Sequence, residues 1–293
     1  MRFTARPATD AAFALGEGPV WDEARSRLLW VDILANTVHE GSLGVDGTVH
    51  ARRSWTFADT VGAVAFAGDG TLLVAERHTL TRVGLDDTRT HVARVLPEDR
   101  ASRLNDGAVD PAGRFLVGSL AQDDRRGEEV LVRLEDSGVT VLDADLDLSN
   151  GLAWSPAGDR FYSVDTLPGL VRVRDYDPAT GAVGERRDLL TIADGHPDGM
   201  CTDAEGNLWI AVWGGARVEC RSPAGALLAT VDVPALNTSS CTFAGDLLVI
   251  TTAARGMPRE RRPEFPDAGR IFTARVGVHG LPTPSWVPPA CAP

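Results

Sequence analysis

Residues 151–166, GLAWSPAGDRFYSVDT, contain the pattern that decides the fold. A short apolar segment begins at Gly151, a turn-forming stretch follows at residues 156–159, and a second apolar segment leads to Asp165. Pro, Gly and Asp tolerate the backbone angles of a tight turn, and short apolar runs on both sides of such a turn are typical of a β-hairpin. The stretch therefore predicts two antiparallel strands joined by a short loop.

The same pattern recurs along the chain at intervals of 41–48 residues, in units that begin at Gly18, Gly62, Gly107, Gly151, Gly199 and Ser240. A third, alternating segment follows in each unit, as at residues 170–174, and a weaker fourth segment closes it, as at residues 227–233. Four antiparallel strands in each repeat of about 40 residues are typical of a propeller blade. We therefore predict an all-β, six-bladed β-propeller that forms a single domain over residues 1–293; a long β-sandwich, the alternative, would not require an equal period.

The two ends of the chain do not belong to complete units. The sixth unit, residues 240–278, lacks a fourth strand, and residues 2–6 have no other place. We expect the N-terminal segment to complete the last blade and close the ring, because closure removes open sheet edges. The proline-rich tail, residues 281–293, is expected to be extended and loosely held.

Composition narrows the class of partner. The formal net charge is −12, which disfavours binding to nucleic acid or to an anionic membrane. The 4 cysteines form no C-x-x-C pair, and the first residues include no apolar stretch typical of a secretion signal. We expect a reduced cytoplasmic protein that acts on a small molecule as a monomer or weak homo-oligomer.

Oxygen-bearing residues recur at one position of the repeat. The residue before each repeat start would lie at the mouth of the central channel, and those residues are Glu17, Val61, Asp106, Asn150, Asp198 and Ser239. Glu17, Asn150 and Asp198 would converge on the axis, with Asp106 and its neighbour Asn105 as further candidates. Converging carboxylates repel one another unless a cation lies between them, and oxygen donors suit Ca²⁺, Mg²⁺ or Mn²⁺. The alternative is that these residues only cap strands and form turns.

Six motifs occur in order between about Leu15 and Gly280: EGPVW (17–21), RLNDG (103–107), SNGL (149–152), PDGM (197–200), DAEGNLWIA (203–211) and TSSC (238–241). Together they resemble the senescence marker protein (regucalcin) and gluconolactonase family. The resemblance implies a six-bladed propeller with one divalent cation, with Ca, Zn, Mn, Mg and Fe all open. It also implies that Glu17, Asn150 and Asp198 are the ligands and that Arg103 and Asn105 contact substrate.

The sequence of this chain differs from the family pattern in the loop after the third-blade strand. The mammalian members have a Glu-Glu pair there, whereas this chain has Ala121-Gln122-Asp123-Asp124. Asp123 is the residue expected to contact substrate in this loop. The difference leaves the identity of the sugar open.

The function that the resemblance implies is metal-dependent hydrolysis of a small lactone, such as gluconolactone, arabinonolactone or xylonolactone. Asp198 would be both ligand and general base, with a metal-bound hydroxide as the alternative way to activate water. Other functions stay open: hydrolysis of another ester or a phosphotriester, a role in specialised metabolism, or a non-catalytic propeller that binds calcium or a protein.

Two further residues are candidates for the surroundings of the site. His196, two residues before Asp198, would support the ligands or relay a proton, and Trp213 would form a wall of the pocket. The alternatives are a solvated loop histidine and a packing tryptophan.

Overall fold

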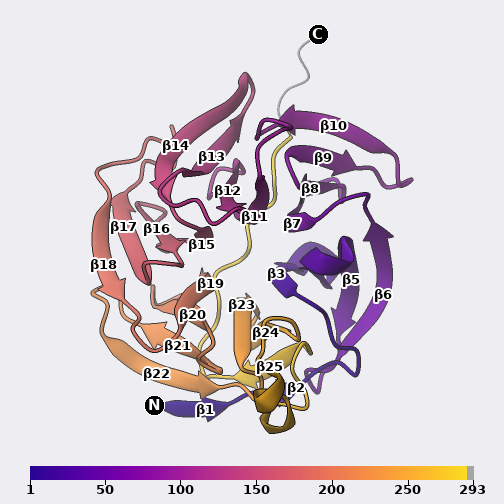
Figure 1. The fold of residues 1–293 in the computed structure, drawn as a ribbon, viewed down its shortest axis with the longest axis vertical. Helices are drawn as coiled ribbons and strands as arrows, with labels where there is room; N and C mark the ends of the chain where they lie inside the picture. Colours follow the sequence, from indigo (N-terminus) through magenta and orange to yellow (C-terminus); the bar gives the residue numbers. More distant parts are fainter. Residues whose placement is uncertain (289–293) are drawn as a thin grey trace.

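The computed structural model describes residues 1–288 and consists of six β-sheets arranged around one axis (Figure 1). The sheets are the predicted blades, so the six-bladed propeller is confirmed. From the axis outward, blade one is formed by β3 (Gly16–Asp22), β4 (Arg27–Asp32), β5 (Thr37–Leu43) and β6 (Val49–Thr56). Blade two is formed by β7 (Val61–Phe66), β8 (Leu72–Glu76), β9 (Thr79–Val83) and β10 (Arg89–Arg94). Blade three is formed by β11 (Ser102–Val109), β12 (Phe115–Ala121), β13 (Glu129–Glu135) and β14 (Gly138–Leu146).

Blade four is formed by β15 (Ser149–Trp154), β16 (Arg160–Asp165), β17 (Leu170–Asp175) and β18 (Arg187–Thr191). Blade five contains β19 (His196–Thr202), β20 (Leu208–Trp213), β21 (Arg217–Arg221) and β22 (Leu227–Asp232). Blade six contains β23 (Asn237–Ala244), β24 (Leu247–Ala253) and β25 (Phe272–Arg275). Short 3₁₀ turns occur at η1 (Glu23–Arg25), η2 (Ile33–Ala35) and η3 (Arg259–Glu264). Within residues 1–288, no helix has the length and apolar character needed to cross a membrane.

The N-terminal segment closes the ring, but it is divided between two blades. β2 (Arg6–Pro7) pairs antiparallel with β25 and is the fourth strand of blade six, as predicted. β1 (Arg2–Thr4) instead runs parallel to β22 and adds a fifth strand to blade five. The division occurs at Ala5, which is only 2% exposed and packs into the apolar cluster between these two blades. The segment therefore joins blades five and six across their interface.

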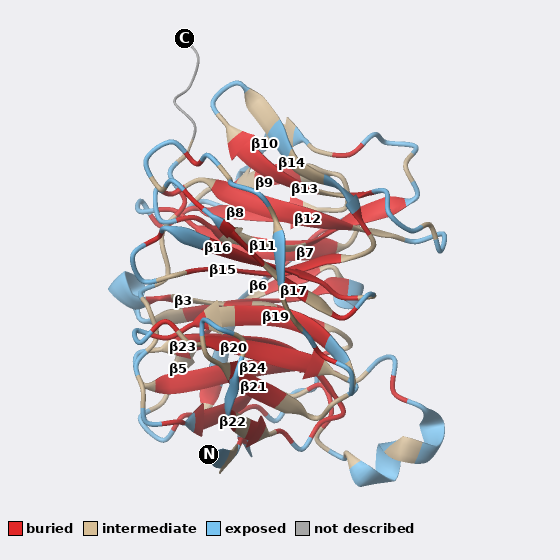
Figure 2. Ribbon diagram, turned by 90° about the vertical axis from the view of Figure 1, so that its left-hand side faces the viewer, coloured by how far each residue is buried: buried red, intermediate tan, exposed pale blue. Residues whose placement is uncertain are grey.

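Most strand residues are buried, whereas many loop residues are exposed (Figure 2). The apolar core lies between the blades. Six clusters of buried side chains occur, and each one joins two neighbouring blades. Trp209 and Phe243, for example, meet edge to face across blades five and six, with ring centroids 5.6 Å apart. Burial of one large apolar side chain contributes about 1.5–3 kcal/mol, so each interface, which buries several of them, holds its two blades together.

Each innermost strand is irregular at the repeat position. The pairing between the first and second strand of every blade changes register there, for example between Glu17 and Val20 in β3 and between Asn150 and Leu152 in β15. Such a bulge bends the strand and turns a side chain that would otherwise follow the pleat. A Cβ atom at Gly151 would lie 2.4 Å from the carbonyl oxygen of Asp198, so neighbouring strands approach too closely for any side chain at this position.

The tail is held in place as far as residue 288, which corrects the expectation that it is loose. Residues 280–288 cross the middle of the ring from blade five to blades two and three (Figure 1), and we call this segment the strap. Leu281 N donates to Thr202 O at 3.3 Å, and Trp286 N donates to Phe66 O at 2.7 Å. The Trp286 side chain is 2% exposed, inside the cluster between blades two and three. Residues 289–293 lie outside the described part of the chain.

We expect Trp286→Ala to lower the free energy of unfolding by about 3–5 kcal/mol, because it removes a fully buried aromatic side chain and leaves a cavity. The matched control is Val287→Ala, since Val287 is the next residue but is 61% exposed, and it should change stability by less than about 0.5 kcal/mol. Urea denaturation of both variants measures the difference. Equal midpoints for the two variants would show that the strap does not hold the ring.

Candidate functional site

The innermost strands bring the predicted ligands together in the channel. Glu17 lies on β3, Asn150 on β15 and Asp198 on β19, and their exposed fractions are 7%, 5% and 4%. Their order around the axis follows the order of the blades, because each occupies the same bulge position of its strand. Asp106, from β11, belongs to the same group, since its charge acts on both Glu17 and Asp198. Residues far apart in sequence thus form one buried polar cluster.

Asn150 has a fixed orientation in this cluster. Its Nδ2 donates to Asp198 Oδ1 and, at 3.0 Å, to Thr166 Oγ1. Thr166 in turn donates its hydroxyl hydrogen to Pro197 O at 2.9 Å. The amide oxygen of Asn150 is buried and has no hydrogen-bond partner within residues 1–288. A buried acceptor without a donor costs free energy, so this oxygen is available to a ligand.

The surroundings of the acidic residues in this cluster disfavour their charged forms. Burial, and then the charge of Asp106, raises the pKa of Glu17 to about 8. Burial, and then the charges of Glu17 and Asp106, raises the pKa of Asp198 well above its usual value. Burial also raises the pKa of Asp106 to about 6. A cation between these carboxylates would stabilise their charged forms and reverse the shifts.

Arg103 and Asn105 connect the cluster to blade four. Arg103 Nη1 donates to Asn105 Oδ1 at 2.7 Å and to Leu104 O at 3.0 Å, and Asn105 Nδ2 donates to Ser149 O at 2.9 Å. Arg103 is only 7% exposed, and burial lowers its pKa to about 10, against the opposing effect of Glu17 and Asp198. The guanidinium therefore remains charged at neutral pH, beside the acidic cluster.

The donors present fit a hard divalent cation. Within residues 1–288 no three His, Cys, Asp or Glu side chains form a ligand group, so a site here requires the amide oxygen of Asn150 beside Glu17 and Asp198. Carboxylate and amide oxygens are typical ligands of Ca²⁺, Mg²⁺ and Mn²⁺, and the absence of nitrogen or sulfur donors in this set disfavours Zn²⁺.

The structure does not bring Asp123 into the cluster. Asp123 lies in the loop after β12, its side chain is 42% exposed, and its carboxylate pairs with Arg125 Nε at 2.8 Å. Arg125 also donates to Ser102 Oγ at 3.0 Å, one residue before Arg103. A substrate contact by Asp123 stays a prediction, and it would require this ion pair to change.

His196 and Trp213 lie at the same end of blade five. They are paired across β19 and β20, and His196 is exposed, with its Nδ1 atom 3.3 Å from Thr166 O. Trp213 is half-buried and packs toward Gly256. Neither side chain has a hydrogen bond to the ligand residues, whereas Thr166, which the sequence analysis did not select, does. The repeat gives no signal for it, because the residue after the strand-ending Asp is Thr166 in blade four but Ile33 in blade one.

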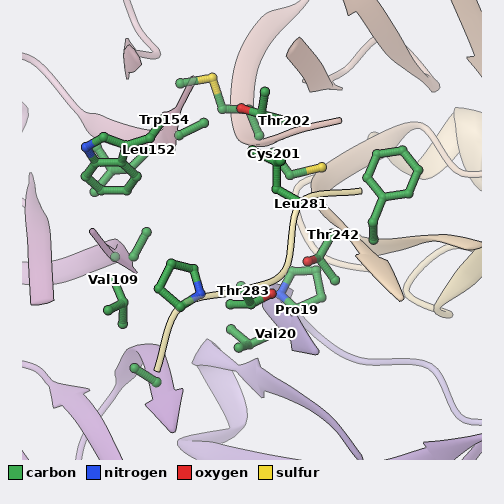
Figure 3. A pocket seen from close by; sticks show the side chains of 18 of the residues that line it. Pro19, Val20, Val109, Leu152, Trp154, Cys201, Thr202, Thr242, Leu281 and Thr283 are labelled. Atoms are coloured by element: carbon green, nitrogen blue, oxygen red, sulfur yellow. The ribbon is translucent and has the colours of Figure 1, made fainter. Parts of the chain in front are cut away.

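A cavity of about 460 Å³ lies on the strap side of the cluster (Figure 3). It is lined by residues that follow the ligand positions along the innermost strands, among them Val20, Val109 and Leu152, and by strap residues 281–284. The lining is mostly apolar. The channel therefore has a polar layer and, beyond it, an apolar chamber that the strap crosses.

Fold and site together define a class: a six-bladed β-propeller with a buried oxygen-donor cluster on its axis. Residues 15–254 match the family profile described as the SMP-30/gluconolactonase/LRE-like region, and the chain belongs to that family. It is 37% identical to regucalcin of Danio rerio over 286 residues, which cover 93% of this chain and 94% of that protein.

Two solved structures show the same likeness. The calcium-binding protein regucalcin from Agrobacterium tumefaciens superimposes with a TM-score of 0.91 and 27% identity, over 98% of each chain. A gluconolactonase from Xanthomonas campestris superimposes with a TM-score of 0.73 and 26% identity, over 92% of this chain and 89% of that chain. The resemblance inferred from the sequence motifs is therefore confirmed.

Without a bound cation, we expect stability to fall as the pH rises. Folding raises the pKa of Glu17 to about 8, so the folded state binds more protons than the unfolded state above pH about 4.5. The stability present at low pH is lost as the pH rises through about 8. Glu17→Gln removes this titration, so from pH about 5 to about 8.5 wild type should lose at least about 1.4 kcal/mol relative to the variant.

Thermal unfolding of both proteins after chelation, at several pH values, measures this difference. The comparison cancels the titration of groups that do not interact with Glu17, and the pKa of Asp198, which the Glu17 charge raises, should fall in the variant and add to the difference in the same direction. Parallel stability curves for wild type and Glu17→Gln would contradict a strongly raised pKa for Glu17.

Proposed function

We propose that this protein hydrolyses small lactones with the help of one divalent cation held by Glu17, Asn150 and Asp198. The observation that carries the proposal is the unpartnered, buried amide oxygen of Asn150 beside two carboxylates whose pKa values are raised. Membership in the gluconolactonase family, and the regucalcin and gluconolactonase relatives, support the reaction class.

Lactone hydrolysis requires a polarised carbonyl, an activated water and a stabilised oxyanion. A bound cation supplies Lewis acidity for the first and third requirements. We assign Asp198 to accept the water proton. Its carboxylate is buried, Oδ1 accepts a hydrogen bond from Asn150, and Oδ2 has no protein donor within residues 1–288. The remaining oxygen is therefore the atom that would accept the proton.

Arg103 would orient the substrate. The guanidinium has five N–H donors, and its recorded hydrogen bonds use only Nη1. Its position beside Glu17 and Asp198 is suited to a hydroxyl or ring oxygen of a sugar lactone, and its charge favours an oxygen that becomes negative during the reaction. A polyhydroxylated substrate fits these donors better than an apolar ester, which supports an aldonolactone such as gluconolactone.

Calcium binding without catalysis is the second candidate. The Agrobacterium tumefaciens relative is described as a calcium-binding protein, and an all-oxygen donor set suits calcium. Both candidates require the cluster to bind a cation. They differ in whether turnover follows binding.

We expect the full-length protein, chelated and then reloaded with individual divalent ions, to hydrolyse at least one aldonolactone in a pH-indicator assay. Asp198→Ala should lower kcat/KM by about 10²–10⁴-fold, the usual contribution of a general base. Asp136→Ala is the control, because Asp136 is an exposed acidic residue in the turn before β14. Cation binding without turnover on any lactone would favour the non-catalytic candidate.

Thr166→Val tests the orientation of Asn150. The variant keeps the shape of the side chain but removes the hydroxyl that accepts from Asn150 Nδ2 and donates to Pro197 O. We expect cation affinity to fall about 10–100-fold, as for other groups that orient metal ligands, measured by titration calorimetry on chelated protein. Thr90→Val, on the exposed outer strand β10, is the matched control, and an equal affinity of the two variants would contradict the orienting role.

A further inference from the structure

Two cysteines face each other where blades five and six meet. Cys201 lies on β19 and Cys241 on β23, the innermost strands of these blades, and their Sγ atoms are 3.8 Å apart. Both residues line the cavity below the polar cluster, where Figure 3 labels Cys201. All three cysteines in the described part of the chain, the third being Cys220, are free thiols. The proposed hydrolytic site uses none of them.

The spacing suits bond formation. A disulfide has an S–S distance of about 2.05 Å, so the two sulfur atoms would have to approach by about 1.8 Å from their present contact. β19 and β23 belong to different sheets, and no backbone ladder pairs them. Their separation is set by side-chain packing, which a rotation about each Cα–Cβ bond and a small strand shift can accommodate.

The two thiols differ in access. Cys201 retains part of its surface on the cavity, whereas Cys241 is 3% exposed and donates to Trp209 O at 3.3 Å. A small oxidant in the cavity would therefore meet Cys201 first, and Cys241 would be the group that resolves the product. A bulky disulfide reagent would need to displace the strap residues that cover the cavity.

We propose that Cys201 and Cys241 form a reversible disulfide when hydrogen peroxide enters this cavity. The Cys201 sulfur attacks one peroxide oxygen, the O–O bond breaks, and a sulfenic acid and water form. The Cys241 sulfur then attacks the Cys201 sulfur, the S–O bond breaks, and a second water leaves. Two thiols lose two electrons and two protons in total, and one hydrogen peroxide is reduced to two waters.

Burial, followed by contact with Cys241, raises the pKa of the Cys201 thiol. The thiol is therefore neutral at neutral pH, and the first step is slow compared with that of an activated cysteine. The proposal depends on the 3.8 Å distance between the two sulfur atoms, which favours the second step over further oxidation of Cys201. The bond would link blades five and six three residues after Asp198, at the interface that the N-terminal segment covers.

The reduced full-length protein is treated with hydrogen peroxide, alkylated and digested with trypsin without reductant. Cleavage at Arg187, Arg217, Arg221 and Arg255 places the three cysteines on three separate peptides. We expect a linked pair that contains Cys201 and Cys241, a loss of about 2 Da relative to the free peptides, and separation of the pair by a thiol reductant. The oxidised protein should also unfold at a higher temperature than the reduced protein, because the bond constrains the unfolded chain.

Cys220→Ser and Cys291→Ser serve as controls and should leave the linked pair in place. Cys241→Ser should instead allow Cys201 to proceed to the sulfinic acid, and the wild-type peptide map remains decisive if this variant does not fold. Three results would overturn the proposal. The first is a sulfinic Cys201 in wild type with Cys241 still alkylated, and the second is a link from Cys201 to Cys220 or Cys291. The third is that both thiols of the folded protein stay reduced under conditions that oxidise the unfolded protein. None of these results depends on whether the protein hydrolyses lactones.

Discussion

The close approach of six innermost strands around one axis is the constraint on which the rest of the structure depends. A Cβ atom at Gly62 would lie 2.5 Å from Asn105 O, and one at Gly151 would lie 2.4 Å from Asp198 O. Strands this close leave no room for a side chain at Gly62 or Gly151, and in each innermost strand the pairing shifts register around the repeat position. The same geometry that closes the ring therefore directs Glu17, Asn150 and Asp198 into one cluster.

Burying the acidic cluster costs folding free energy, and the apolar packing between the surrounding blades offsets this cost. Burial raises the pKa of Glu17, Asp106 and Asp198, and the charges of neighbouring carboxylates raise those of Glu17 and Asp198 further. The apolar clusters lie between blades, outside this polar layer, and each of them holds two neighbouring innermost strands in place. The positions of the polar groups are thus enforced by packing that they do not take part in. Such enforced proximity of like charges is typical of a site that gains stability when a ligand binds.

The sequence was sufficient to predict the blades and the cluster because both follow from the repeat. One position in a 41–48-residue period determines where a side chain lies relative to the axis, whatever the rest of the unit contains. Features that depend on contacts between non-equivalent parts were not predictable in this way. The N-terminal segment changes blade at Ala5 because of a buried contact. Cys201 and Cys241 lie close together because of the distance between two strands, and the sequence repeat does not predict that distance. Thr166 was missed because it lies in the turn after β16, outside the repeat position, and its link to Asn150 is a side-chain hydrogen bond.

The strap shows why composition alone was misleading. Prolines indicated a loose tail, yet Pro282 and Pro284 lie in the part of the strap that crosses the apolar cavity. A chain that crosses an apolar space cannot satisfy its backbone N–H groups through a ladder, and proline has no N–H group to satisfy. Proline therefore suits this crossing, while Leu281 and Trp286 provide the anchors at the two ends.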